Sequence, residues 1–193
     1  NIALMRQAQS VKKGVRANGG TPREFCTITV TDGIAMGHEG MKSSLISREV
    51  IADSAELTVR GHCYDALVGI AGCDKSLPAL MMSMVRLNVP SVFIYGGSIL
   101  PGRYKGKDVT VVDVFEAVGK HSSGQMSSAE LRKLELVACP SAGACGGQFT
   151  ANTMACVSEA IGLALPYSAG TPAPYEERDT YAKASGKTVM NLL

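Results

Sequence analysis

Two short apolar runs, each ended by glycine, constrain the fold of this chain more than any other feature of its sequence. Residues 66–71 run up to Gly72, and residues 91–95 run up to Gly96 and Gly97. Runs of this length and composition are typical of strands that are buried on both faces, as in parallel sheets. The apolar residues between them recur at helical spacing, so the sequence predicts a strand–helix–strand unit.

Further patterns extend this unit into an α/β fold. Residues 25–30 alternate and include β-branched side chains, which predicts another strand that leads into a glycine-rich turn. Apolar periodicity predicts six helices, around residues 4–15, 45–57, 77–87, 111–118, 131–134 and 154–164, with Thr110, Ser127 and Thr150 as N-caps. We therefore expect a mostly parallel sheet with helices on both faces, and functional residues in the turns after Val30, Ala71 and Tyr95.

Length and composition narrow the class of protein. The chain has 193 residues, of which 46% are hydrophobic, enough for one α/β domain with a real core. Its net charge is +2 with no basic run, and no apolar stretch approaches the ~20 residues of a membrane span, so we expect neither nucleic acid nor a membrane as partner. Because it starts at Asn1 rather than Met and stops at Leu193 in a structured pattern, we expect a fragment or a processed chain. Residues 1–165 are expected to form the α/β domain, incomplete at its N-terminus, and residues 166–193 a loop and the start of the following segment.

The chain contains six cysteines, an even number that raises the question of disulfides. The chain is too long and too apolar to need disulfides for its stability, and nothing marks it as secreted. The expected roles are therefore apolar packing, metal ligation or catalysis. We expect Cys26, Cys63 and Cys156 to be buried packing residues.

Candidate ligands follow two of the predicted strands. Cys73, Asp74 and Lys75 come in succession after the first apolar run, and Asp32 lies in the turn after residues 25–30. Thiolates suit iron–sulfur clusters or zinc, while carboxylates suit magnesium, so these turns can place two unlike metals side by side. The alternatives are a loop with a buried cysteine beside a surface Asp–Lys pair, and an ordinary Asp–Gly turn.

Two glycine-rich segments are further candidates. Residues 139–147 hold Cys139 and Cys145 just before a predicted helix, whose N-terminus favours thiolates, and one of the two is expected to join Cys73 as a ligand. A linker with two buried cysteines is the alternative. Residues 96–105 offer free amides and cations for a carboxylate or phosphate, or form a flexible basic loop. His62 and His121 are expected to be structural. His38 is expected to be structural as well, with a role as acid, base or ligand as the alternative.

Three long segments resemble the dihydroxy-acid dehydratase family and follow one another in family order. They read TDGIAMGHEGMKSSLISREVIADS, GCDKSLPALMMSMVRLNVPSVFIYGGSILPG and ACPSAGACGGQFTANTMA. They extend from Thr31 to Ala155, and the flanking residues also resemble the family. Three such segments in order are specific, and the resemblance implies the N-terminal domain of a larger two-domain enzyme.

The resemblance also implies cofactors and a reaction. Cys73 and Cys145 would ligate an iron–sulfur cluster, [2Fe–2S] rather than [4Fe–4S]. Asp32 and Asp74 would bind Mg²⁺, and Lys75 would bind the same ion as a carbamate. The family removes water from a 2,3-dihydroxy acid to give a 2-keto acid, a step towards valine and isoleucine.

Other parts of the family's machinery are expected outside this sequence. The resemblance places a base serine and a glutamate ligand for magnesium in a C-terminal domain, and a third cluster cysteine just before the position of Asn1. We therefore expect these 193 residues alone to be inactive. A homodimer is expected, in the cytoplasm of a bacterium or in a plastid or mitochondrion.

Two alternatives to this function remain open. A sister enzyme acting on sugar acids, such as 6-phosphogluconate or pentonate dehydratase, would use similar cofactor chemistry. A non-enzymatic module would use Cys73 and Cys145 as zinc ligands or as redox thiols. The Asp–Lys pair beside Cys73 argues against such a module, because a structural zinc site needs neither residue.

Overall fold

A parallel pair of short strands forms the centre of the computed structural model, which describes residues 2–193. Strand β1 (Leu67–Ala71) pairs in parallel with β2 (Ser91–Tyr95), and helix α4 (Ser76–Leu87) connects them. The predicted strand–helix–strand unit is therefore confirmed, with β1 beginning one residue later than expected. The backbone N–H of Phe93 donates to Leu163 O at 2.7 Å, which extends the sheet beyond β2 by a short parallel bridge.

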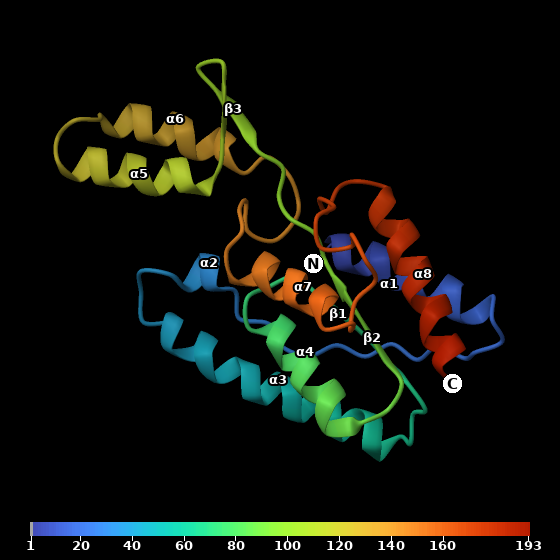
Figure 1. The fold of residues 1–193 in the computed structure, drawn as a ribbon. Helices are drawn as coiled ribbons and strands as arrows, with labels where there is room; N and C mark the ends of the chain where they lie inside the picture. Colours follow the sequence, from blue (N-terminus) through green and yellow to red (C-terminus); the bar gives the residue numbers. More distant parts are fainter. Residues whose placement is uncertain (1) are drawn as a thin grey trace.

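Helices cover both faces of this sheet, as the α/β pattern predicted (Figure 1). Phe93 and Tyr95 are buried on one face, in a core shared with α3 (Met41–Gly61), α4 and α7 (Thr150–Ala160). Val92 and Ile94 are buried on the other face, against α1 (Ile2–Arg16) and α8 (Glu177–Leu192). Successive side chains of a strand point to opposite faces, so a strand covered on both sides needs an unbroken apolar run.

Helix α8 was not predicted, because its buried face consists mainly of small residues rather than a row of large apolar ones. Ala182, Ser185 and Gly186 are buried on that face. A Cβ on Gly186 would collide with the backbone of α1 at Val11 and Val15, so the two helices approach closely only because this position is glycine. The helix therefore belongs to the same packed body as the sheet.

A separate arm projects from this body (Figure 1). It consists of the antiparallel strands β3 (Gly102–Tyr104) and β4 (Lys107–Val109) and the helices α5 (Val111–Ser122) and α6 (Ser128–Ala138). Both N-caps that were predicted for the arm are confirmed. Thr110 and Asp113 form a reciprocal capping box at the start of α5, and Ser127 Oγ accepts from the backbone N–H of Glu130 at the start of α6. The arm has its own small core, formed by Val109, Ala117, Leu134 and Ala138.

Two expectations about local structure were wrong. Residues 25–30 form no strand, because no neighbouring strand pairs with them, and they instead lead from α1 to the short helix α2 (Asp32–Ala35) as an irregular segment. The N-cap of α7 is Phe149, and Thr150 is the first helical residue. The proline-rich stretch 167–174 has no helix or strand, as expected.

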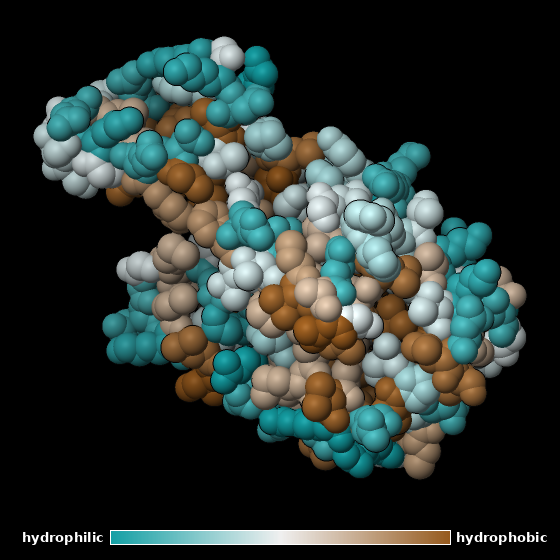
Figure 2. Space-filling model, viewed as in Figure 1, coloured by the Kyte–Doolittle hydropathy of each residue, from teal (hydrophilic) through white to brown (hydrophobic). Residues whose placement is uncertain are grey.

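The surface of the molecule mixes polar and apolar areas. Figure 2 shows polar residues over much of the arm and a gathering of hydrophobic residues over α7. Within residues 2–193, none of the helices has both the length and the apolar character that crossing a membrane requires.

Candidate active site

Two carboxylates and a lysine meet at the carboxyl end of β1. Lys75, directly before α4, donates from Nζ to Asp32 Oδ2 at 3.1 Å and also to Asp74 Oδ2. The side chains of Lys75, Asp32 and Asp74 are only 14%, 15% and 8% exposed. The first and second predicted turns therefore bring their candidate ligands together.

A serine that the sequence analysis missed completes this cluster. Ser44, in the first turns of α3, is fully buried, and its hydroxyl donates to Asp32 Oδ1. Asp32 is thus held through both carboxylate oxygens, one by Ser44 and the other by Lys75. Ser44 lies among ordinary helix residues in the sequence, so only its position in the fold reveals this role.

The cluster stabilises the charged form of its members. Burial acts to raise the pKa of Asp32, but hydrogen bonds with Asp74, Ser44 and Lys75 prevail, so the pKa lies below its usual value. Burial likewise acts to lower the pKa of Lys75, but hydrogen bonds to the two aspartates prevail and raise it. The Lys75 ammonium thus lies between the two aspartates.

The two thiols predicted as ligands lie at the same end of the sheet. Cys73 is the second residue after β1. A short parallel bridge positions Cys145: Ala144 N donates to Gly97 O, and Ile99 N donates to Ala144 O, both at 2.8 Å. Both thiols are partly buried.

The pKa of Cys145 reflects both the other thiol and the acidic cluster. Burial raises the pKa of the Cys145 thiol, and negative charge on Cys73, Asp74 and Asp32 raises it further. Such an effect requires that these groups lie within electrostatic range of Cys145. A bound cation would act in the opposite direction and favour the thiolate.

The loop that carries Cys145 depends on one glycine. Gly143 has φ +145°, and a Cβ there would lie 2.6 Å from Ser98 O. A larger residue would therefore push this loop away from the segment after β2. The glycine-rich composition of residues 139–147 thus reflects a close backbone approach beside the site.

Tyr95, the last residue of β2, was also missed, because a tyrosine in an apolar run reads as part of the core. It is fully buried, and its hydroxyl has no hydrogen-bond partner among residues 2–193. Burial raises its pKa well above the usual value, and Cys145 is the charged neighbour with the largest effect. The Arg178 guanidinium lies 5.7 Å from the centroid of the tyrosine ring.

The remaining sequence candidates lie elsewhere. Arg103 and Lys105 pair with Asp108 and Glu130 on the arm, at 2.9 and 2.6 Å, so these cations are engaged away from the site.

The expectation that three cysteines are buried packing residues was wrong, because the segments that carry them expose the thiols to solvent: Cys26, Cys63 and Cys156. Cys139 is exposed as well. The histidines make local contacts, as expected of structural residues, with Ile34 O, Thr58 O and Ser128 Oγ: His38, His62 and His121.

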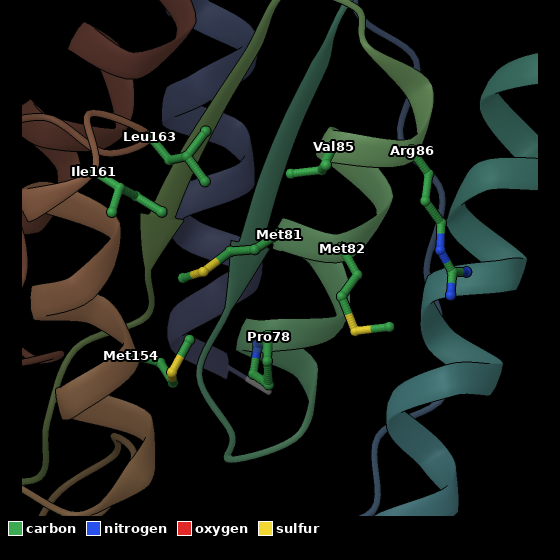
Figure 3. Close-up of a pocket in the computed structure, with 8 residues that line it drawn as sticks. All are labelled: Pro78, Met81, Met82, Val85, Arg86, Met154, Ile161 and Leu163. Atoms are coloured by element: carbon green, nitrogen blue, oxygen red, sulfur yellow. The ribbon is translucent and has the colours of Figure 1, made fainter.

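Two hollows border this region. An apolar groove of about 420 Å³ lies between α4 and the segment from α7 to Leu163, and Figure 3 shows Met81, Met154 and Leu163 along it. It contains none of the candidate ligands. A second recess of about 290 Å³ lies beside Cys145 and is lined by Ser98, Ile99, Pro101, Thr110, Gly146, Gly147, Asn152 and Gly170. Gly146, which lines this recess, is the neighbour of Cys145 in the sequence. The apolar groove has no such link to a candidate ligand.

Comparison with known proteins agrees with this architecture. The family model described as "Dihydroxy-acid/6-phosphogluconate dehydratase N-terminal" matches residues 1–193. Over the whole chain, relatives named "Dihydroxy-acid dehydratase" are 94% identical in Pelagibacter ubique, 83% in Parvibaculum lavamentivorans and 54% in Metallosphaera sedula. The chain spans about a third of the length of each of these relatives (34%, 34% and 35%). The chain therefore belongs to the dihydroxy-acid/6-phosphogluconate dehydratase family, as its N-terminal region.

Proposed function

We propose that the whole protein removes water from a 2,3-dihydroxy carboxylic acid to give a 2-keto acid, a step towards valine and isoleucine. The observation that carries this proposal is the meeting of two kinds of ligand at one end of the sheet. The hard oxygens of Asp32 and Asp74 lie around Lys75, and Cys145 lies within electrostatic range of both aspartates and of Cys73. The family match and the names of the relatives support the same reaction.

The acidic cluster fits Mg²⁺. Asp32 and Asp74 supply the oxygen ligands that this ion prefers. The Lys75 ammonium lies between both aspartates, so a divalent cation would compete with it. As a carbamate, Lys75 would exchange its positive charge for a further oxygen ligand. Among the described residues no three acidic, cysteine or histidine side chains form a complete ligand set, so this proposal needs a further ligand, the expected glutamate of the C-terminal region.

The thiols fit an iron–sulfur cluster, with [2Fe–2S] favoured over [4Fe–4S]. Cys73 and Cys145 are partly buried, and a cluster needs thiolates that are shielded but reachable. The third cluster cysteine is expected beyond residues 2–193. The Tyr95 hydroxyl near Cys145 adds a polar group that none of the described residues satisfies.

The reaction breaks the C2–H and C3–O bonds of the substrate, and the resulting enol becomes the 2-keto acid. When bound, the two cofactors would supply Lewis acidity for the departing hydroxide and stabilise the negative charge on the substrate. In this chain, Ser44 fixes the orientation of Asp32, and the recess beside Cys145 leaves room for a small acid. The base that takes the C2 proton is expected to be a serine of the C-terminal region.

The test is turnover by the full-length protein. We expect it to dehydrate branched 2,3-dihydroxy acids in preference to sugar acids. Preference for 6-phosphogluconate or a pentonate would instead support the sugar-acid alternative, which the family description also includes. Detectable dehydration by residues 1–193 alone would contradict the proposal that the base lies outside them.

A non-enzymatic zinc or redox module is the remaining alternative. Metal analysis of the full-length protein distinguishes this module from the dehydratase, since zinc without iron or sulfide supports the module. We further propose that the enzyme acts as a homodimer in a bacterial cytoplasm. Light scattering and cell fractionation test these two points.

A further inference from the structure

Tyr95 has a hydroxyl that nothing in the described chain satisfies. The residue is fully buried, and its hydroxyl has no hydrogen-bond partner among residues 2–193. Leaving a buried polar group unpaired destabilises the folded state. A phenylalanine at the end of β2 would provide the same apolar surface without that cost, so the oxygen needs an explanation.

The backbone brings the end of β2 close to the segments that carry the two candidate cluster ligands. Tyr95 is in register with Ala71, and Gly96 N donates to Ala71 O at 2.7 Å, so the chains that leave β1 and β2 run together. Cys73 follows two residues after Ala71. The bridge between residues 98 and 144 places the Cys145 segment beside the chain that leaves β2.

The side chains confirm this placement. Tyr95 lies in the core on the α4 face of the sheet, and Cys145 packs against the same core. Cys145, Cys156 and Cys73 all act electrostatically on the tyrosine hydroxyl, with the effect of Cys145 the largest of the three. A neutral phenol donates one hydrogen bond, and it keeps its proton at any pH well below about 10.

Arg178 is not the missing acceptor. Its guanidinium has only donors, and it faces the ring of Tyr95, with 5.7 Å between Cζ and the ring centroid. Arg178 is itself fully buried, and it donates from Nη1 to Ser168 O and Thr171 O, while Nε and Nη2 have no partner among residues 2–193. Beside Tyr95, Arg178 thus provides donors that are unpaired among residues 2–193 and a buried positive charge, which together favour an electron-rich group.

We infer that the Tyr95 hydroxyl donates a hydrogen bond to a sulfur atom of the iron–sulfur cluster that Cys73 and Cys145 hold. This inference rests on the proposed function. Donors to cluster sulfur stabilise the more negative, reduced form and so raise the reduction potential. The buried charge of Arg178 acts in the same direction. Tyr95 is therefore a residue that tunes the cluster without ligating it.

The test compares Tyr95→Phe with the wild type in the full-length protein, reconstituted anaerobically. The matched control is Tyr104→Phe, in β3 on the arm. We would measure iron and sulfide content, the reduction potential, and the coupling of exchangeable protons to the reduced cluster by electron–nuclear double resonance in H₂O and D₂O. Tyr95→Phe is expected to keep the cluster, to lower its reduction potential and to lose one exchangeable proton coupling, while Tyr104→Phe matches the wild type.

The outcomes separate this inference from the proposed function. A wild type that holds no cluster overturns both. A wild type with a cluster, and a Tyr95→Phe variant with unchanged potential and proton couplings, overturns the inference alone. If Tyr95→Phe fails to fold, the wild type still decides, because the absence of any strongly coupled exchangeable proton contradicts the hydrogen bond.

Discussion

Lys75 Nζ lies 3.1 Å from Asp32 Oδ2, although 43 positions separate the two residues in the sequence. The contact joins the turn after β1 to the short helix α2, so residues that read as two unrelated turns form one site. Because Asp74 accepts from the same ammonium, the local fold depends on this ion-pair cluster as well as on apolar packing.

Replacing Asp32 is expected to lower stability in a pH-dependent way. The pKa of Asp32 is lower in the folded chain than its ordinary value of about 3.9, so its ionised form contributes stability above that value, and the contribution is lost as the pH falls through the folded-state pKa. Asp32→Asn should therefore reduce the free energy of unfolding by about 1–3 kcal/mol at pH 7. The difference from the wild type should shrink below pH ~4.

Urea unfolding at several pH values measures this effect. Asp65→Asn, at an exposed position before β1, is the matched control and should change stability little. A loss of stability in Asp32→Asn that is the same at pH 7 and at pH ~3 would show that the carboxylate charge plays no part.

Ser44→Ala is expected to disturb the site more than a neighbouring serine does. It removes the hydroxyl that donates to Asp32, whereas Ser47 donates only to Ser44 O within α3, at 2.6 Å. We expect Ser44→Ala to weaken Mg²⁺ binding by the full-length protein about 10–100-fold, because the orientation of a ligand is lost. Ser47→Ala should bind almost normally. Titration with Mn²⁺ as a spectroscopic substitute measures both variants, and equal affinities would exclude a role for Ser44 in orienting Asp32.

Gly143→Ala is expected to displace the loop that carries Cys145. The added Cβ would meet Ser98 O at 2.6 Å at a positive φ, whereas a Cβ on Gly146 would have its nearest neighbours, Thr110 Cβ and Val111 N, at 3.8 Å. Gly143→Ala should therefore reduce the iron content of the full-length protein, and Gly146→Ala should retain more of it. Iron bound per protein chain is the measurement, and normal loading of Gly143→Ala would show that the loop tolerates a side chain there.

Asp113→Ala is expected to loosen the arm and leave the body intact. The carboxylate of Asp113 accepts from Thr110 N at 2.7 Å, which closes the capping box of α5. Loss of such a cap costs about 0.5–2 kcal/mol. Amide hydrogen exchange should accelerate in α5, while α4 and β2 keep their protection. Glu116→Ala, on the exposed surface of the same helix, is the control, and equal exchange in the two variants would contradict the capping role.

The sequence predicted the elements whose signals are local. The strands that end at Ala71 and Tyr95 are visible as apolar runs ended by glycine. The N-cap residues Thr110 and Ser127 mark the starts of α5 and α6. Residues 25–30 had a strand pattern but no partner, and pairing is a property of the whole fold. Helix α8 was missed because close packing on α1 uses small residues, which carry little periodic signal.

Some residues of the candidate site could likewise be predicted from local sequence signals, and others could not. Asp74 and Lys75 were singled out because they follow β1, at the end of the strand where parallel sheets place their ligands. Asp32 was singled out after residues 25–30, which form no strand, so an irregular segment and not the sheet brings it to Lys75. Ser44 and Tyr95 were missed because their significance comes from what lies opposite them after folding. No local spacing distinguishes a serine in a helix or a tyrosine at a strand end from ordinary packing residues.

The most direct test of the proposed site is the iron and sulfide content of the full-length protein, prepared anaerobically, with its visible absorption spectrum. Cys73→Ser is the decisive variant, and Cys63→Ser, at an exposed position, is the control. We predict iron, sulfide and cluster absorption in the wild type and in Cys63→Ser, and their loss in Cys73→Ser. A wild type without iron after anaerobic reconstitution would contradict the proposed cluster and the dehydration chemistry built on it.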